Sequence, residues 1–272
     1  MQWEFAGQIG PEAGRYVIRR YAGDDARHVV VIGDLEAPRR RRLARGRTKR
    51  ATPGAEPATV EVTRATVITT DPLPEDGAAE WLDAAVRDRD ATVGEALALL
   101  NRTIHGHRLA ARDPYVAEVG AGQALATRIG YGSGEQVADG DWEAARELPR
   151  QKPPRSMLNP QQRLAALLSG RDVALACEEL ALRARLDLDQ DRGREAALQL
   201  AAALDAALAE LEGWRGTDTV ARRLDELHGH REAVDAAARA AREGGLQAEH
   251  MVAIEAALGR LEATLRARIA SL

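Results

Sequence analysis

Apolar and polar positions alternate through the first seventy residues with the two-residue period of β-strands. Residues 15–21 (RYVIRRY) and 28–35 (HVVVIGDL) are rich in β-branched side chains, and a turn-forming cluster with Gly and Asp separates them. Residues 59–70 alternate between Thr or charged positions and Val, as a strand with one solvated face does. Trp3 and Phe5, two positions apart, indicate a further short strand. We predict an antiparallel β-meander of three or four strands.

After residue 77, the spacing of apolar residues changes from the two-residue period of a strand to the period of a helix. Residues 78–90 and 92–110 have apolar stripes at helical spacing, and Thr92 precedes Glu95 by three positions, which is a capping-box pattern. Because so small a sheet cannot bury its apolar face alone, we expect these helices to cover it. Two shorter helical pieces are predicted at 121–129 and 141–148.

The last third of the chain is built from Ala, Leu, Arg and Glu, which are good helix formers. Glycines divide it into five predicted helices, at 160–169, 172–188, 194–212, 217–242 and 246–271. Leucines recur along one stripe of each long helix. Short connections between long amphipathic helices favour an antiparallel helical bundle or hairpin array.

These patterns predict an α+β protein that is mostly α. The first domain, residues 1–148, would be a small β-sheet with covering helices and a disordered Arg-rich loop at about 37–58. A Pro-rich linker at 149–156 would join it to the helical bundle at 157–272. The leucine stripes of the C-terminal helices are explained equally well by packing within one chain and by a homo-oligomer.

Composition narrows the functional classes. The chain has 272 residues, and its 38 basic and 42 acidic residues give a net charge of −4, so bulk charge does not make it a polyanion binder. Cys177 is the single cysteine, which excludes an intrachain disulfide and a multi-cysteine metal site. The chain opens with no targeting signal, and its longest Leu/Ala stretch, residues 196–211, is interrupted by charged positions. We therefore expect a cytoplasmic protein without a membrane partner.

Residues 39–50, which we call the basic run, are the most specific feature of the sequence. The run contains eight basic residues and no acidic one: Arg39, Arg40, Arg41, Arg42, Arg45, Arg47, Lys49 and Arg50. The rest of the chain then has 30 basic residues against 42 acidic ones. Mutual repulsion prevents such a run from folding onto itself, and its cations can neutralise several phosphates without reading sequence. The partner it predicts is a nucleic acid or an acidic protein; the alternative is a solvated loop, or one attracted to the protein's own acidic helices.

Two histidine pairs share the pattern His-Gly-His-Arg, His105 with His107 and His228 with His230. Both lie in predicted helices, where positions i and i+2 point about 200° apart, so the two rings of a pair diverge. A shared metal would require the helix to break at the glycine. We predict no metal and no cofactor.

Three other motifs are incomplete. Residues 187–193 begin like a calcium loop, but Arg192 stands where the turn requires glycine. Residues 130–135 are rich in glycine, but no Lys-Ser/Thr follows and a predicted helix precedes them, so we interpret them as a turn after a helix. No serine has the surroundings of an activated nucleophile.

We predict a non-enzymatic interaction or regulatory protein that contacts a polyanion through the basic run, and we assign no catalytic residue. Two alternatives remain open. One is an enzyme with an acid–base site at the junction of sheet and helices, for which the candidates are His105, Asp113, Tyr131 and Glu135, together with His107 and Tyr115. The other is a purely structural homo-oligomer.

Overall fold

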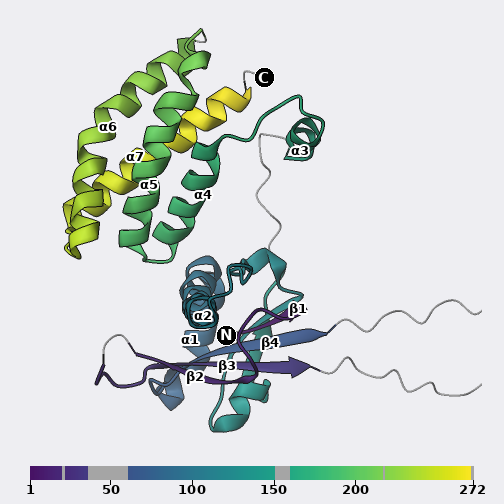
Figure 1. Cartoon of the computed structure of the whole chain (residues 1–272). Helices are drawn as coiled ribbons and strands as arrows, with labels where there is room; N and C mark the ends of the chain where they lie inside the picture. Colours follow the sequence, from purple (N-terminus) through teal and green to yellow (C-terminus); the bar gives the residue numbers. More distant parts are fainter. Residues whose placement is uncertain (20–21, 36–60, 151–159, 217, 271–272) are drawn as a thin grey trace, which may run out of the picture. The chain divides into compact units, whose positions relative to one another are not determined.

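The computed structural model describes residues 1–19, 22–35, 61–150, 160–216 and 218–270. The chain forms two compact units, Met1–Pro153 and Pro154–Leu272 (Figure 1). The division falls inside the segment predicted as a linker, residues 149–156. The fold class is the predicted one, an α+β protein that is mostly α.

The N-terminal unit contains one antiparallel six-stranded sheet. Its strands are β1 (Gln2–Ala6), β2 (Gly14–Ile18), β3 (His28–Leu35), β4 (Val62–Thr69), β5 (Ala126–Tyr131) and β6 (Ala144–Glu147). The spatial order is β2-β3-β4-β1-β5-β6. Strands β2, β3 and β4 form the predicted meander, and β1 extends the sheet on the other side of β4. The sheet is therefore larger than the three or four strands predicted.

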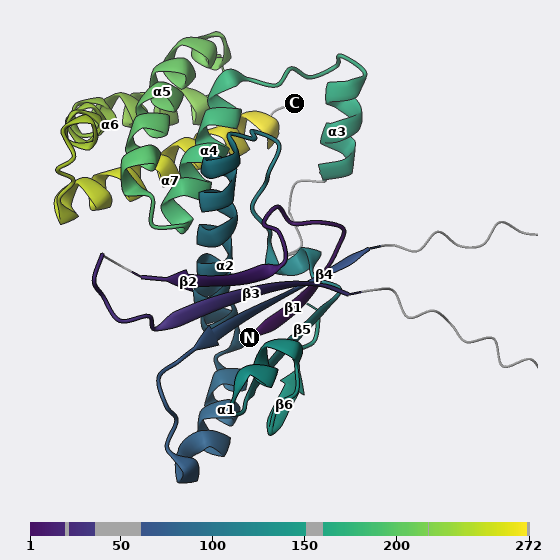
Figure 2. The same cartoon turned by 60° about the horizontal axis from the view of Figure 1, so that its bottom comes forward.

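Two helices, α1 (Ala78–Arg87) and α2 (Arg89–Ala111), cover one face of this sheet (Figure 2). Side chains at alternate strand positions point toward them, because successive residues of a strand face opposite sides. The shared core includes Trp3, Phe5, Val30, Ile32, Ala65, Val67 and Ile129 from the strands and Leu82, Leu100 and Ile104 from the helices. The helices fulfil the role expected of 78–90 and 92–110.

On the opposite face, a short helical turn, η3 (Glu135–Asp139), lies over β1 and β4. The side-chain amide of Gln2 donates to the Thr66 hydroxyl at 3.0 Å, and both side chains donate to the carbonyl of Ala138. Gln2 and Thr66 are almost fully buried, and these bonds offset the cost of removing them from water. The turn η3 therefore covers part of the second face of the sheet, and the buried polar side chains beneath it have hydrogen-bond partners.

Three local predictions were wrong. Residues 121–129 and 141–148 contain strands β5 and β6 instead of helices. Pairing of β5 with β1 and β6 supplies its backbone partners, so tertiary context overrides a weak helical pattern. Thr92 does not cap a helix: α2 begins at Arg89, and the Thr92 hydroxyl donates to the carbonyl of Asp88 at 2.9 Å.

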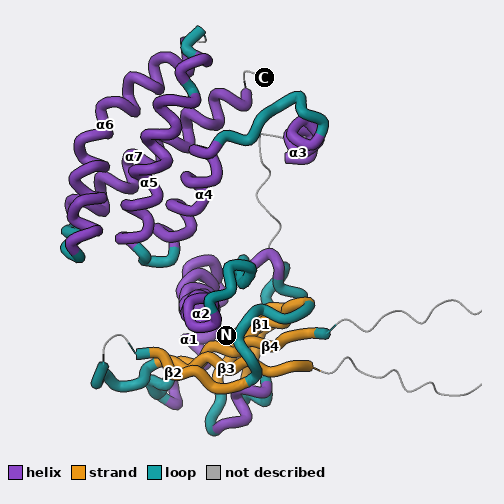
Figure 3. The backbone as a smooth tube through the Cα atoms, in the orientation of Figure 1, coloured by secondary structure: helices purple, strands orange, loops and turns teal. Residues whose placement is uncertain are grey.

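The C-terminal unit is helical, with five helices close to the predicted ranges (Figure 3). They are α3 (Pro160–Leu168), α4 (Ala176–Asp189), α5 (Gly193–Glu210), α6 (Asp218–Glu243) and α7 (Ala248–Ala270). Helices α4 to α7 pack around one apolar core, to which the predicted stripes contribute Leu200, Leu204, Leu224, Leu227, Leu258 and Leu261. The leucine stripes therefore pack against one another within a single chain. No helix in the described ranges combines the length and the apolar character needed to cross a bilayer.

Helix α3 differs from the other four because none of its residues is buried. Leu168 is 81% exposed and Leu164 is about half exposed. The helix is attached to the bundle through a polar side chain, Arg163, which is described below.

Candidate functional site

The basic run, Arg39 to Arg50, lies outside the described residues, and so does the whole of the predicted loop at 37–58. The strands on either side of it are well defined. β3 and β4 are paired from His28 opposite Thr69 to Leu35 opposite Val62. The intervening 26 residues, 36–61, therefore connect two adjacent strand ends that a hairpin turn of two to five residues would join.

The returning end of this connection is attached to strand β1. The backbone N–H of Gly7 donates to the carbonyl of Glu61 at 2.7 Å, and the Thr63 hydroxyl donates to the carbonyl of Gly7 at 2.8 Å. Ala6 is the register partner of Val62. The basic run thus joins the fold at the end of the sheet where β1 finishes and β4 begins.

Many arginines of the described residues form ion pairs. At least twelve of them pair with Asp or Glu: Arg15, Arg64, Arg89, Arg128, Arg163, Arg183, Arg185, Arg192, Arg215, Arg231, Arg260 and Arg268. In the described parts of the chain, many arginines therefore balance a local carboxylate.

A cavity of about 500 Å³ lies at the same end of the sheet. Its lining includes Ala6 and Gln8, which flank Gly7, together with residues from the end of α2 and from the connection that follows it. The polar side chains in the lining are Gln8, His107, Asp113, Tyr115, Glu118 and Gln123, and the apolar ones include Phe5, Ile9 and Val116. The volume lies in the range of small-molecule sites.

The walls of this cavity are held by specific contacts. The side chain of Asn101, almost fully buried on α2, donates to the carbonyl of Val119 at 3.0 Å and accepts from its N–H at 2.9 Å. Gly10 has φ +117°, and a Cβ there would lie 2.9 Å from a methyl carbon of Val116. Glycine is therefore required for the connection after β1 to approach the connection after α2.

The charged groups around the cavity have unequal numbers of partners. The Glu118 side chain is only 3% exposed, and its Oε1 lies 3.5 Å from Nδ1 of His105. Nδ1 of His105 also lies 2.8 Å from a guanidinium nitrogen of Arg108. Asp113 accepts the backbone N–H of Tyr115 at 2.9 Å, and no ion pair to Asp113 occurs within the described residues.

The structure brings together only some residues of the predicted acid–base site. His107, Asp113 and Tyr115 line the cavity, and His105 approaches it through Glu118. Tyr131 and Glu135 are not part of its lining. Tyr131 is the last residue of β5, whereas the residue of β5 that pairs with Glu4 of β1 is Ala126, at the other end of the strand. Glu135 forms an ion pair with Arg15 at 3.3 Å.

Glu118, Gln8 and Gln123 were missed because their connections have no periodic pattern. The only hint of these lining residues in the sequence is that an aromatic residue, Tyr115, and an acidic residue, Glu118, follow Asp113. The Gly-rich residues 130–135 begin in strand β5 and end at the first residue of η3, so a strand and not a helix precedes the turn, contrary to the prediction. The helical turn has only five residues and no lysine.

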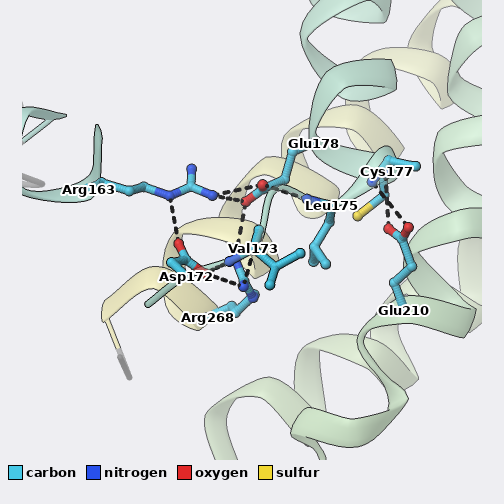
Figure 4. Close-up of polar contacts among 9 residues, drawn as sticks. Arg163, Asp172, Val173, Leu175, Cys177, Glu178, Glu210 and Arg268 are labelled. Atoms are coloured by element: carbon cyan, nitrogen blue, oxygen red, sulfur yellow. Dashed lines mark hydrogen bonds and ion pairs between the residues drawn. The ribbon is translucent and has the colours of Figure 1, made fainter. Parts of the chain in front are cut away.

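The C-terminal unit contains a network of four charged side chains, of which Arg268 and Asp172 are buried (Figure 4). Arg268 is 2% exposed and donates to Asp172 at 2.7 Å, and Arg163 donates to both oxygens of Glu178 at 2.6 and 2.7 Å. Arg163 also reaches Asp172 at 3.3 Å. Two guanidinium groups face two carboxylates, so the charges balance, and the network attaches α3 to the bundle.

The carboxylates near the start of α4 have shifted pKa values. Burial would raise the pKa of Asp172, but the N–H of Val173 and the guanidinium groups of Arg268 and Arg163 outweigh it, so the pKa lies below its ordinary value of 3.8. Burial would likewise raise the pKa of Glu210, which hydrogen bonds from Cys177 and Ala176 lower below 4.5. Burial and the Glu210 carboxylate raise the pKa of the Cys177 thiol, which favours the unreactive protonated form.

The other motifs form no site in the described ranges. His228 is exposed on α6, whereas His105 belongs to the other unit. Asp187 pairs with Arg192 at 2.7 Å, and Asp189 pairs with Arg185 at 3.6 Å. Across the described residues, no three His, Cys, Asp or Glu side chains are grouped to hold a metal ion.

Comparison with known proteins identifies no relative: no family model, no curated protein and no solved structure matches this chain.

Proposed function

We propose that this protein is a non-enzymatic, cytoplasmic interaction protein that binds a nucleic acid or another polyanion through the basic run. The observation that carries the proposal is the insertion itself. A connection of 26 residues, with eight basic residues in one acid-free run, joins two strand ends that pair directly. Because a short turn would complete the same sheet, the length and charge of this connection are not needed for folding.

Charge distribution supports an external ligand. At least twelve of the described arginines pair with carboxylates of their own unit, whereas the basic run contains no acid. A run of eight cations would bind phosphates by neutralising them and releasing counterions, with little dependence on base sequence. The remaining chain, with 30 basic and 42 acidic residues, would repel the same ligand.

The helical unit would supply a surface for a second partner or for another copy of the chain. Its leucine seams, including Leu258 and Leu261, are buried inside the unit. Self-association would therefore have to use the exposed leucines, of which Leu164, Leu168 and Leu182 are examples.

The test measures the affinity of the full chain for a fluorescently labelled, mixed-sequence DNA duplex and for a labelled RNA strand at low salt. Replacing the eight basic residues of the run by Gly and Ser should weaken binding to both at least tenfold, because each lost cation leaves one phosphate unneutralised. Polyglutamate added as a competitor shows whether an acidic protein occupies the same residues.

Two control variants make the result specific. Changing the seven arginines of the run to lysine keeps the charge, and binding should persist. Changing Arg183, Arg231 and Arg260 to serine removes exposed arginines that already pair with carboxylates, and affinity should stay within about twofold. Equal, weak binding by the native chain and the Gly/Ser variant would refute the proposal.

A further inference from the structure

We infer that the cavity between the end of β1 and the connection after α2 binds a small organic cation, one that has an ammonium or guanidinium group on an apolar body. This site uses no residue of the basic run and selects the opposite sign of charge. It does not depend on the proposed polyanion function.

The charges of the lining point to a cation. Asp113 and Glu118 contribute two carboxylates against one histidine, His107, and no Lys or Arg belongs to the described lining. Glu118 already has His105 at 3.5 Å, whereas the one hydrogen bond that Asp113 accepts from the described residues comes from the backbone N–H of Tyr115. A carboxylate offers about four acceptor positions, so Asp113 has capacity for a charged donor. A phosphate or carboxylate ligand would instead be repelled by both groups.

The shape of the cavity adds an apolar requirement. Phe5, Ile9 and Val116 provide an apolar wall, and Tyr115, which is 91% exposed, stands at the rim. The volume of about 500 Å³ accommodates a small molecule with an aromatic or aliphatic body. Aromatic side chains at such a site also attract a cation through their ring faces.

The site is held in place before any ligand arrives. Asn101 fixes both backbone groups of Val119, one residue after Glu118, and Gly10 permits close approach to Val116. The Asp113 side chain is oriented by the N–H of Tyr115. Because the wall is already ordered, ligand binding does not carry the entropic cost of ordering it.

The experiment titrates the full chain by calorimetry with three compounds of one skeleton: phenethylamine, phenethyl alcohol and hydrocinnamate. The amine should bind at least tenfold more tightly than the neutral alcohol, and the anionic hydrocinnamate should bind more weakly than the alcohol. In Asp113→Asn, the amine should lose about tenfold in affinity while the alcohol is unaffected. The amide oxygen of asparagine still accepts the Tyr115 N–H, so this variant should fold.

Two further variants locate the binding. Ala117→Phe places a bulky side chain at an exposed position of the lining and should abolish binding of amine and alcohol alike. Asp83→Asn, which removes an exposed carboxylate on α1, should change neither affinity. Equal affinities for the three compounds, or amine binding that survives both Asp113→Asn and Ala117→Phe, would overturn the inference.

Discussion

The guanidinium carbon of Arg268 lies 4.8 Å from the centre of the Trp214 ring, and the same group donates to Asp172 at 2.7 Å. A charge this deeply buried is tolerated because acceptors and an aromatic face replace water. Sequence alone did not reveal this network, since its members come from four separate segments. The apolar seams beside it were predicted, because burial of Leu224 or Leu258 follows directly from helical spacing.

Replacing Arg268 by methionine should lower the free energy of unfolding of the helical unit by about 3–5 kcal/mol, because two buried carboxylates lose a partner. Denaturant titration of the full chain, followed by far-UV circular dichroism, measures the loss. Arg183→Ala, which breaks an exposed pair between adjacent helical turns, should cost no more than about 0.5 kcal/mol. Similar costs for the two variants would contradict a buried network.

Glu210 should make the helical unit sensitive to acid. Its pKa is depressed in the folded protein, so its contribution is present above the ordinary value of 4.5 and is lost as the pH falls through the folded pKa. Glu210→Gln should therefore be less stable than the native chain at neutral pH, by about 1 kcal/mol. The two proteins should converge in stability as the pH falls below the folded pKa of Glu210, which lies below 4.5. A difference that stays constant from neutral to acidic pH would exclude this role.

At the scale of elements, the long helices were predicted and two strands were not. Helices α5 and α6 begin and end within about two residues of their predicted limits, because glycines and a strong periodic pattern mark them. Strand β5 has a weak pattern of its own and depends on β1, which lies more than 100 residues earlier in the chain. Of the two carboxylates that line the cavity, Asp113 was among the predicted candidates and Glu118 was not. Glu118 meets His105 of α2 at 3.5 Å, a contact that no local pattern encodes.

Helix α3 provides an element-scale prediction. Because none of its residues is buried and Arg163 connects it to Asp172 and Glu178, Arg163→Ala should release the helix without opening the bundle. Hydrogen exchange followed by mass spectrometry should show faster exchange in residues 160–168 and unchanged exchange in α5. Gln161→Ala, an exposed change on the same helix, serves as the control and should leave both rates unaltered.

At the scale of the whole molecule, positive charge is unevenly distributed. Twelve residues contain eight of the 38 basic side chains, and the remaining chain is acidic. The connection between β3 and β4 contains the densest positive charge in the sequence, because eight of the twelve residues 39–50 are basic and none is acidic. On this account the sheet is a support from which one basic segment is presented to an anionic ligand.

The salt dependence of DNA binding tests this account most directly. If most of the eight cations contact phosphates, the logarithm of the association constant should fall against the logarithm of salt concentration with a slope of roughly −5 to −7. The Gly/Ser variant of residues 39–50 should show a slope near zero. A shallow slope for the native chain, or the same steep slope for the variant, would contradict the central claim that this run is the polyanion-binding element.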